Sequence, residues 1–355
     1  MKSLKTFLIW GIVVLVGVAS FTTLAISRGE QVSAVWMVTA AVSVYCIAYR
    51  FYSLYIAKYV MQLDPNRLTP AERHNDGLDY VPTHKGVLFG HHFAAIAGAG
   101  PLVGPVLAAQ MGYLPGTLWI IFGVVFAGAV QDMMVLFVSM RRDGKSLGDI
   151  VKQELGTVPG VIASIGILMI MVIIMAVLAL IVVKALVHSP WGTFTIAATM
   201  PIALFMGIYT RYIRPGKIGE ISIVGFILLM LAVIYGDNVA HSSIGHWFDL
   251  DGIQLTWAIM IYGFVAAVLP VWLLLTPRDY LSTFLKIGTI IALALGIVIV
   301  NPTLQMPAVT HFIDGSGPVF SGALFPFLFI TIACGAVSGF HALISSGTTP
   351  KMLEN

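Results

Sequence analysis

The sequence predicts an all-α polytopic membrane protein, and three observations indicate this class. Of the 355 residues, 58% are hydrophobic and only 10% are charged, whereas about a quarter of the residues of an ordinary soluble protein are charged. Apolar segments follow one another along the chain, and many reach the length of about 20 residues that spans a bilayer. The basic residues gather in alternate connections, as the positive-inside rule describes.

Ten apolar segments are candidates for membrane-spanning helices. They lie near residues 6–27, 35–57, 91–111, 115–139, 160–186, 191–210, 218–236, 255–276, 281–300 and 320–344. The first follows basic residues, but its apolar run is too long for a signal peptide and has no clear small-residue cleavage site, which favours an uncleaved anchor. We therefore expect two peripheral helices in 1–57, a cytoplasmic loop in 58–90 and a membrane-embedded core in 91–355.

The distribution of Lys and Arg predicts a cytoplasmic amino terminus. In that orientation almost all basic residues outside the spans fall on the inner side, namely Lys2, Lys5, Lys58, Arg67, Arg73, Lys85, Arg141, Arg142, Lys145, Lys152, Arg211, Arg214, Lys217, Arg278 and Lys351. The outer side has Arg28, with Lys184 near a helix end, where a long side chain can extend to the interface. This alternation is consistent only if the segment 91–111 crosses the bilayer completely.

The loop 58–90 is polar and interrupted by prolines. Thr69-Pro-Ala-Glu is a helix-start pattern, which predicts one short surface helix. Basic and acidic residues alternate in this loop, which favours a solvated loop near lipid head groups over a nucleic-acid surface. Cys46 and Cys334 lie inside apolar segments, and we expect both to be free thiols.

The segment 90–116, GHHFAAIAGAGPLVGPVLAAQMGYLPG, predicts a membrane helix that stops and restarts. Pro101 and Pro105 have no backbone N–H to donate, and Gly98, Gly100 and Gly104 support a helix weakly. In lipid, unpaired backbone groups occur only where protein buries them or where they line a polar cavity. These five residues are therefore candidates for a binding site. The alternative is a simple kink, because Gly and Pro are common in membrane helices.

Asp132 is an ionisable residue within an apolar segment. It lies two turns before Arg141, a distance of about 11 Å along a helix, and is therefore too deep to be a simple interface residue. Ionisable groups at such depth are costly and by default functional candidates. A carboxylate there could carry a proton or serve as a structural hydrogen-bond partner, and the sequence leaves both roles open.

His91 and His92 are expected just ahead of the interrupted helix, at its predicted cytoplasmic entrance. Histidine changes protonation most readily at cellular pH, so both are candidates for proton coupling, with an interface role as the alternative. No Cys, His or carboxylate cluster of metal-binding spacing surrounds them, and we expect no metal site.

A second interruption is predicted in the segment 255–276, where Pro270 and Pro277 precede Arg278 and Asp279. A buried ion pair or gate between Arg278 and Asp279 at the inner face is one interpretation. The alternative is an ordinary loop followed by a helix that starts at Asp279.

The last apolar segment contains small hydroxyl side chains and one histidine. Ser345 and Ser346, placed opposite free carbonyl groups of residues 94–98, would give the all-oxygen surroundings that a hard cation needs. With His341 they are candidates for proton or ion coupling, although small residues also simply permit close helix packing. Ser338 and His341 could meet on one helix face as in a hydrolase, but without an orienting group this indication is weak.

The spacing of the two interrupted segments suggests an internal repeat. Counted from the first interrupted segment, five crossings precede the second one, as in a five-plus-five inverted repeat of the LeuT-like kind. That count requires two more helices after the last segment, so we expect the core to be incomplete at its carboxyl end.

Several long runs closely resemble the carbon starvation protein A family of bacterial inner-membrane transporters. They are RHNDGLDYVPT, FGHHFAAIAGAGPLVGPVLAAQMGYLPG, AGAVQDMMVLFVSMRRDG, HSPWGTFT, LPVWLLLTPRDYLSTFLKIG and FPFLFITIACGAVSGFHALISSGTTPK. The resemblance covers almost the whole chain and implies the amino-terminal half of a longer protein. It implies a secondary active transporter that imports peptides or pyruvate, by proton symport, during carbon starvation.

The expected partners are therefore a small carboxylate-bearing substrate, a coupling proton or sodium ion, and the lipid bilayer. No Walker-type phosphate loop occurs, so the chain does not encode ATP drive, and we expect neither a cofactor nor enzymatic activity. A half-helix amino terminus at residues 98–104 could receive the carboxylate. The alternative is a membrane nutrient sensor without transport, but the sequence contains no cytoplasmic signalling domain.

Overall fold

The computed structural model describes residues 12, 16–18, 20, 22–23, 27, 29 and 31–354. In this part of the chain the regular secondary structure is helical, with no β-strand beyond two isolated bridges. The predicted all-α membrane class is therefore confirmed. The predicted segment 6–27 lies mostly outside the described residues.

Fourteen α-helices follow one another in the described part of the chain. They are α2 (Ala34–Ile47), α3 (Pro70–Arg73), α4 (Lys85–Ile96), α5 (Gly100–Ala108), α6 (Tyr113–Gly123), α7 (Ala129–Arg141), α8 (Leu147–Leu155), α9 (Thr157–Leu186), α10 (Pro190–Ile208), α11 (Ile218–Ala240), α12 (Gly252–Val268), α13 (Leu275–Val300), α14 (Phe329–Ala336) and α15 (Gly339–Ser346). Turns of π-helix extend α2 and α10, and another joins α6 to α7. The short helix predicted after Thr69 is α3, and Thr69 and Glu72 form its capping box.

Within the described residues, seven helical segments are long and apolar enough to cross a membrane, and a bent pair makes a possible eighth. The seven are Ala34–Val60, Tyr113–Arg141, Thr157–Leu186, Pro190–Ile213, Ile218–Ala240, Leu275–Val300 and Leu324–Lys351. The pair, α4 with Gly100–Met111, bends by 43°. The predicted span 255–276 is instead the shorter α12, of 17 residues, because the chain leaves the helix just before Pro270, whose ring disfavours helix at the preceding residue.

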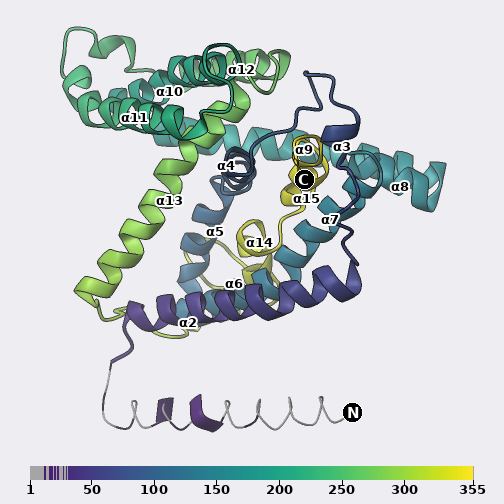
Figure 1. Ribbon diagram of the computed structural model, residues 1–355. Helices are drawn as coiled ribbons and strands as arrows, with labels where there is room; N and C mark the ends of the chain where they lie inside the picture. Colours follow the sequence, from purple (N-terminus) through teal and green to yellow (C-terminus); the bar gives the residue numbers. More distant parts are fainter. Residues whose placement is uncertain are drawn as a thin grey trace.

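The centre of the molecule is formed by segments far apart in sequence. The half-helix α5 packs against α14, while α4 packs against α13 and α15, and α7 packs against α15 (Figure 1). Buried apolar side chains fill the α5–α14 contact, namely Ala108, Met111, Leu328, Ile332 and Ala336. The segment around residue 100 therefore packs on α14 along one side, where Gly104 is buried, whereas Leu102 and Val106 are exposed.

Beside this centre, α10 and α11 pack on each other and on α13, which runs toward α2 (Figure 1), while α12 packs on α9. The α10–α11–α13 contact is closed by Met206, Ile221, Leu229 and Leu281, all of them buried. Through α13, this group reaches α4 and the helix break.

The connections that the sequence assigns to the inner side meet at one end of the molecule. There Val81 N–H donates to Lys351 O at 3.0 Å, and Tyr80 Oη donates to Asp143 O at 3.0 Å. We call this the basic end, formed by residues 61–84, 142–146, 209–217, 269–274 and 347–354. The connections 31–33, 109–113 and 301–323 meet elsewhere, as the bond from Leu304 N–H to Val32 O illustrates.

Candidate functional site

The interrupted segment is broken once, at residues 97–99, between α4 and α5. Pro101 lies in the first turn of α5, where its missing N–H costs nothing. Pro105 lies inside α5, so the second Gly-Pro pair does not add another break. The predicted stop and restart is present, and it produces the 43° bend.

A second broken span, which the sequence reasoning missed, lies in the last segment. α14 ends at Ala336 and α15 begins at Gly339, and the Ser338 side chain caps α15 by accepting from Phe340 N–H at 3.2 Å. Gln131 Nε2 on α7 donates to the free Ser338 carbonyl at 2.8 Å. Gly335 and Gly339, which flank Ser338, are the sequence feature from which this break could have been predicted.

The interruption expected at Pro270 and Pro277 has a different form. Pro270 lies in the connection between α12 and α13, and Pro277 lies in the first turn of α13, where proline is tolerated. The two helices are separate elements, so this is the ordinary-loop alternative, with the helix starting at Leu275 instead of Asp279. The inverted repeat, which was counted from this interruption, stays a prediction.

Two candidates for proton coupling meet beside the second break. His341 Nδ1 on α15 lies 3.1 Å from Asp132 Oδ2 on α7, and the His341 side chain is only 11% exposed. Asp132 Oδ1, His341 Nε2 and the Ser345 hydroxyl are buried without a hydrogen-bond partner among the described residues. Since Ser345 is one helical turn from His341, this small region has unused capacity to bind a proton or a polar ligand.

His91 and His92 lie in the second turn of α4, and not ahead of it as predicted, because the helix already starts at Lys85. His91 is 2% exposed. Its Nδ1 lies 2.9 Å from Asp279 Oδ2, and its Nε2 lies 3.0 Å from Thr348 Oγ1. His92 Nδ1 lies 2.7 Å from Thr349 Oγ1. The two histidines therefore connect α4 to α13 and to the turn after α15.

Arg278 and Asp279 do not form the predicted ion pair within the described structure. Asp279 bonds to His91, whereas the Arg278 guanidinium lies over the Tyr262 ring, 4.7 Å from its centroid. The side chains of adjacent residues on a helix project about 100° apart, so Arg278 and Asp279 do not face each other. Asp279, predicted as part of a gate with Arg278, thus contacts His91 instead.

Lys286 is a cation at the helix break that the sequence reasoning did not single out. Its Nζ, on α13, donates to Ala94 O in the last turn of α4 at 2.7 Å. A helix carboxyl end has a partial negative charge that a cation stabilises. No carboxylate lies within 4.0 Å of Lys286 Nζ in the described part of the chain. A lysine within the apolar segment 281–300 was the signal that could have identified it.

The glycines of the interrupted segment differ in their surroundings. A Cβ on Gly104 would lie 2.5 Å from Thr331 O, and one on Gly100 would clash with Cys334 Sγ. A Cβ on Gly98 would meet nothing within 4 Å. Gly100 and Gly104 therefore permit close approach of α14, and only Gly98 faces open space.

Comparison with known proteins decides the family. Residues 33–355 match the family described as carbon starvation protein CstA. The chain belongs to this family.

Curated relatives match over nearly all of this CstA-family chain. It is 69% identical over 350 residues to the peptide transporter CstA of Escherichia coli (strain K12), with 98% of this chain and 50% of the relative covered. It is 65% identical over 347 residues to the pyruvate/proton symporter BtsT of the same strain, with 98% and 48% covered. The chain thus spans about half the length of these relatives. No solved structure matches it.

In this CstA-family chain, Ser338 and His341 do not form the dyad of a hydrolase. Ser338 Oγ accepts from Phe340 N–H, and His341 bonds to Asp132. The Ser346 hydroxyl donates to Ala342 O of its own helix at 2.8 Å, and its role as an ion ligand stays a prediction. The cap that Ser338 forms gives it a structural role at the start of α15.

Proposed function

We propose that this chain forms part of a proton-coupled importer of small carboxylates in the bacterial inner membrane, with the basic end facing the cytoplasm. Its relatives are named as a peptide transporter and a pyruvate/proton symporter, and both kinds of substrate have a carboxylate. The observation that carries the proposal is the Asp132–His341 hydrogen bond, which joins α7 to the half-helix α15, each within a segment long and apolar enough to span a membrane. An enzymatic role finds no support in these names.

Proton coupling is assigned to the Asp132–His341 pair. With His341 neutral, its Nδ1–H donates to the Asp132 carboxylate, and the pair has one negative charge. Asp132 Oδ1 and His341 Nε2 are both without partners, so either can accept a proton that makes the pair neutral. Since burial makes a net charge costly, protonation would favour the enclosed form of the site and deprotonation an open form.

Carboxylate binding is assigned to the break between α4 and α5. The amino end of α5, at Gly100, has a partial positive charge and backbone N–H groups that can bind an anion. Lys286 adds a full positive charge beside the same break. An ammonium group on Ala94 O also disfavours a sodium ion at that carbonyl, because two cations would compete for one oxygen. We therefore favour a proton over sodium as the coupling ion.

The gate at the basic end is assigned to the contacts of α4 with α13 and with the turn at residues 349–351. They consist of the His91–Asp279 and His92–Thr349 hydrogen bonds. Opening toward the basic end would have to break both bonds, because each joins different elements.

Uptake into proteoliposomes tests the proposal. The chain is reconstituted, and the longer peptide transporter CstA of Escherichia coli is reconstituted in parallel. Each is offered labelled pyruvate or a labelled dipeptide, with and without an inward proton gradient. We expect accumulation that requires the gradient and stops when a protonophore is added. Substrate binding without any uptake by the longer relative would favour the sensor alternative, and accumulation independent of the gradient would contradict proton coupling.

A further inference from the structure

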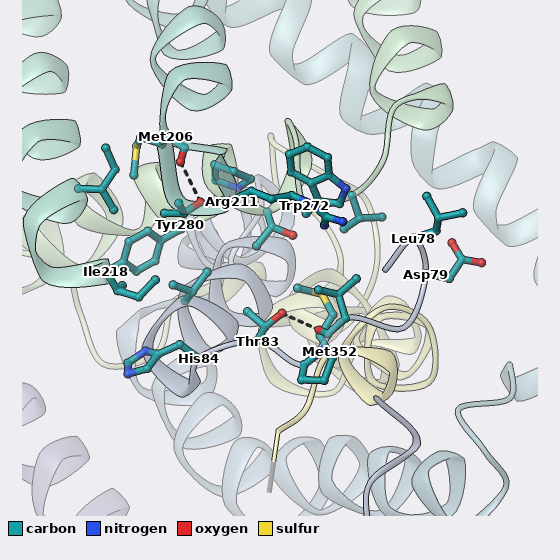
Figure 2. A pocket seen from close by; sticks show the side chains of 18 residues that line it. Leu78, Asp79, Thr83, His84, Met206, Arg211, Ile218, Trp272, Tyr280 and Met352 are labelled. Carbon is teal, nitrogen blue, oxygen red and sulfur yellow. Dashed lines mark hydrogen bonds between the residues drawn. The ribbon is translucent and has the colours of Figure 1, made fainter. Parts of the chain in front are cut away.

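A cavity of about 240 Å³ opens at the basic end, away from the helix break. Its walls come from the end of α10, the start of α11, the connection before α13 and the segment 78–84 (Figure 2). Trp272, Tyr280, Met206, Ile221 and Met352 give it a mainly apolar lining. None of the residues assigned above to proton or carboxylate binding lines it.

Arg211 provides a cation in this lining. Its guanidinium lies over Trp272, 4.3 Å from the ring centroid, and Nη2 donates to Gly77 O at 3.4 Å. No carboxylate lies within 4.0 Å of it among the described residues. Asp79 lies at the margin, with its carboxylate turned away from Arg211 and Trp272 (Figure 2). Because a guanidinium has five N–H donors, Arg211 can still bind an anion.

Thr276 provides an independent polar group in the same wall. The residue is only 5% exposed, and its hydroxyl has no hydrogen-bond partner in the described part of the structure. A buried hydroxyl without a partner is unfavourable, so a small side-chain movement that uncovers this atom would let it bond a ligand or a water. The hydroxyl of Tyr280, one turn further along α13, is already bonded to Ser222 Oγ at 2.8 Å.

We propose that this cavity is a peptide-binding site at the basic end of the molecule. The terminal carboxylate of the peptide binds Arg211, an apolar side chain packs on Trp272 and Met206, and a polar backbone group reaches Thr276. Pyruvate has a single methyl group and would leave most of the apolar lining uncovered, so the site discriminates in favour of peptides. The inference rests on the proposed import function, for which it names the class of substrate.

The position of the cavity connects it to the gate. Tyr280 and Pro277 line it, and Asp279, which bonds His91, lies between them in sequence. Val87, which also lines it, is one turn before His91 on α4. A peptide that binds here therefore contacts both helices that the His91–Asp279 bond joins, as a substrate passing the gate would.

Calorimetric titration of the purified protein in detergent tests the site without transport. The ligands are Leu-Leu, Leu-Leu amide, Gly-Gly and pyruvate. We expect Leu-Leu to bind most tightly. Arg211→Gln should weaken Leu-Leu binding about tenfold or more, because a charge-assisted hydrogen bond is lost, and should leave the binding of the amide unchanged. Arg211→Lys should restore part of the affinity, which separates loss of charge from misfolding.

Matched variants complete the experiment. Thr276→Val keeps the shape of the side chain and should weaken Leu-Leu binding severalfold. Lys217→Gln removes a neighbouring positive charge that does not line the cavity, and it should bind like the unmodified protein. Equal affinity of pyruvate and Leu-Leu, or unchanged Leu-Leu binding by Arg211→Gln, would overturn the proposal.

The two proposals fail separately. Loss of binding in Arg211→Gln together with uptake that ignores the proton gradient would leave the peptide site standing and refute proton-coupled import. Gradient-driven uptake together with unchanged peptide binding by Arg211→Gln would support proton-coupled import and refute the peptide site.

Discussion

Asp132 and His341 are 209 positions apart in the chain, yet their side chains are 3.1 Å apart and join α7 to the half-helix α15. The contact exists because the second break, at residues 337–338, lies beside α7, where Gln131 bonds to Ser338 O. A proton that binds this pair changes the charge beside the start of α15. The helical hydrogen bonding is interrupted there, between Ala336 and Gly339. Local movement there requires fewer hydrogen bonds to be broken than movement of an intact helix.

Asp132→Asn should remove gradient-driven accumulation while substrate binding persists. The amide keeps the size of the side chain and the contact with His341, but it cannot take up a proton at neutral pH. The measurement is uptake at several pH values, with counterflow exchange as the control for binding and opening. Unaltered pH-dependent accumulation would leave Asp132 with a structural role.

Lys286→Met should lower the affinity for carboxylate substrates about tenfold or more, since a charged group near the proposed anion site is lost. It also leaves Ala94 O without its donor, which should cost about 1–3 kcal/mol of stability. The thermal midpoint in detergent and the KM for uptake measure the two effects. If KM stays constant while the midpoint falls, Lys286 only caps α4.

The glycines of the first break should differ in their tolerance of a side chain. Gly104→Ala places a Cβ against Thr331 O and should destabilise the protein by about 1–3 kcal/mol through overpacking. Gly98→Ala, in open space, should fold normally. Thermal unfolding of both variants gives the comparison, and equal midpoints would show that the α5–α14 contact is looser than described.

The His91–Asp279 contact should show energetic coupling. His91→Gln and Asp279→Asn each remove one partner of a bond within a mostly buried site, and the double variant should lose less than the sum of the single losses. Thermal unfolding gives the stability term, and the accessibility to a thiol reagent of a cysteine introduced into α4 reports opening. Strict additivity would mean that the two side chains do not act together.

Asp76 should titrate below its usual range. The backbone N–H groups of Leu78, Tyr80 and Asp79 donate to its carboxylate and lower its pKa. Because the pKa is lower in the folded state, these bonds add stability above the unfolded pKa, and this stability is lost as the pH falls through the folded value. Carboxyl carbon NMR of the labelled protein measures the titration of Asp76. In Asp76→Ala the Asp76 carboxyl signal should disappear, together with the part of the pH dependence of stability that Asp76 contributes.

The sequence by itself determined the class of the protein, the position of the first break and the short helix α3. These depend on local properties. Long apolar runs need a bilayer, proline lacks an N–H, and Thr69 with Glu72 caps a helix wherever the chain lies. The sequence also identified Asp132 and His341 one at a time, because an ionisable side chain within an apolar segment is visible without any partner.

Only the tertiary structure decided which of these groups meet. The structure pairs Asp132 with His341 and Asp279 with His91. It places Lys286 Nζ on Ala94 O. Arg278 contacts the Tyr262 ring and not Asp279. The packing of α5 on α14 and of α4 on α13 sets these partners. A membrane helix is apolar on nearly all sides, so its hydrophobic pattern does not specify which other helix it packs against. Contacts between residues distant in the chain are therefore known only from the folded structure.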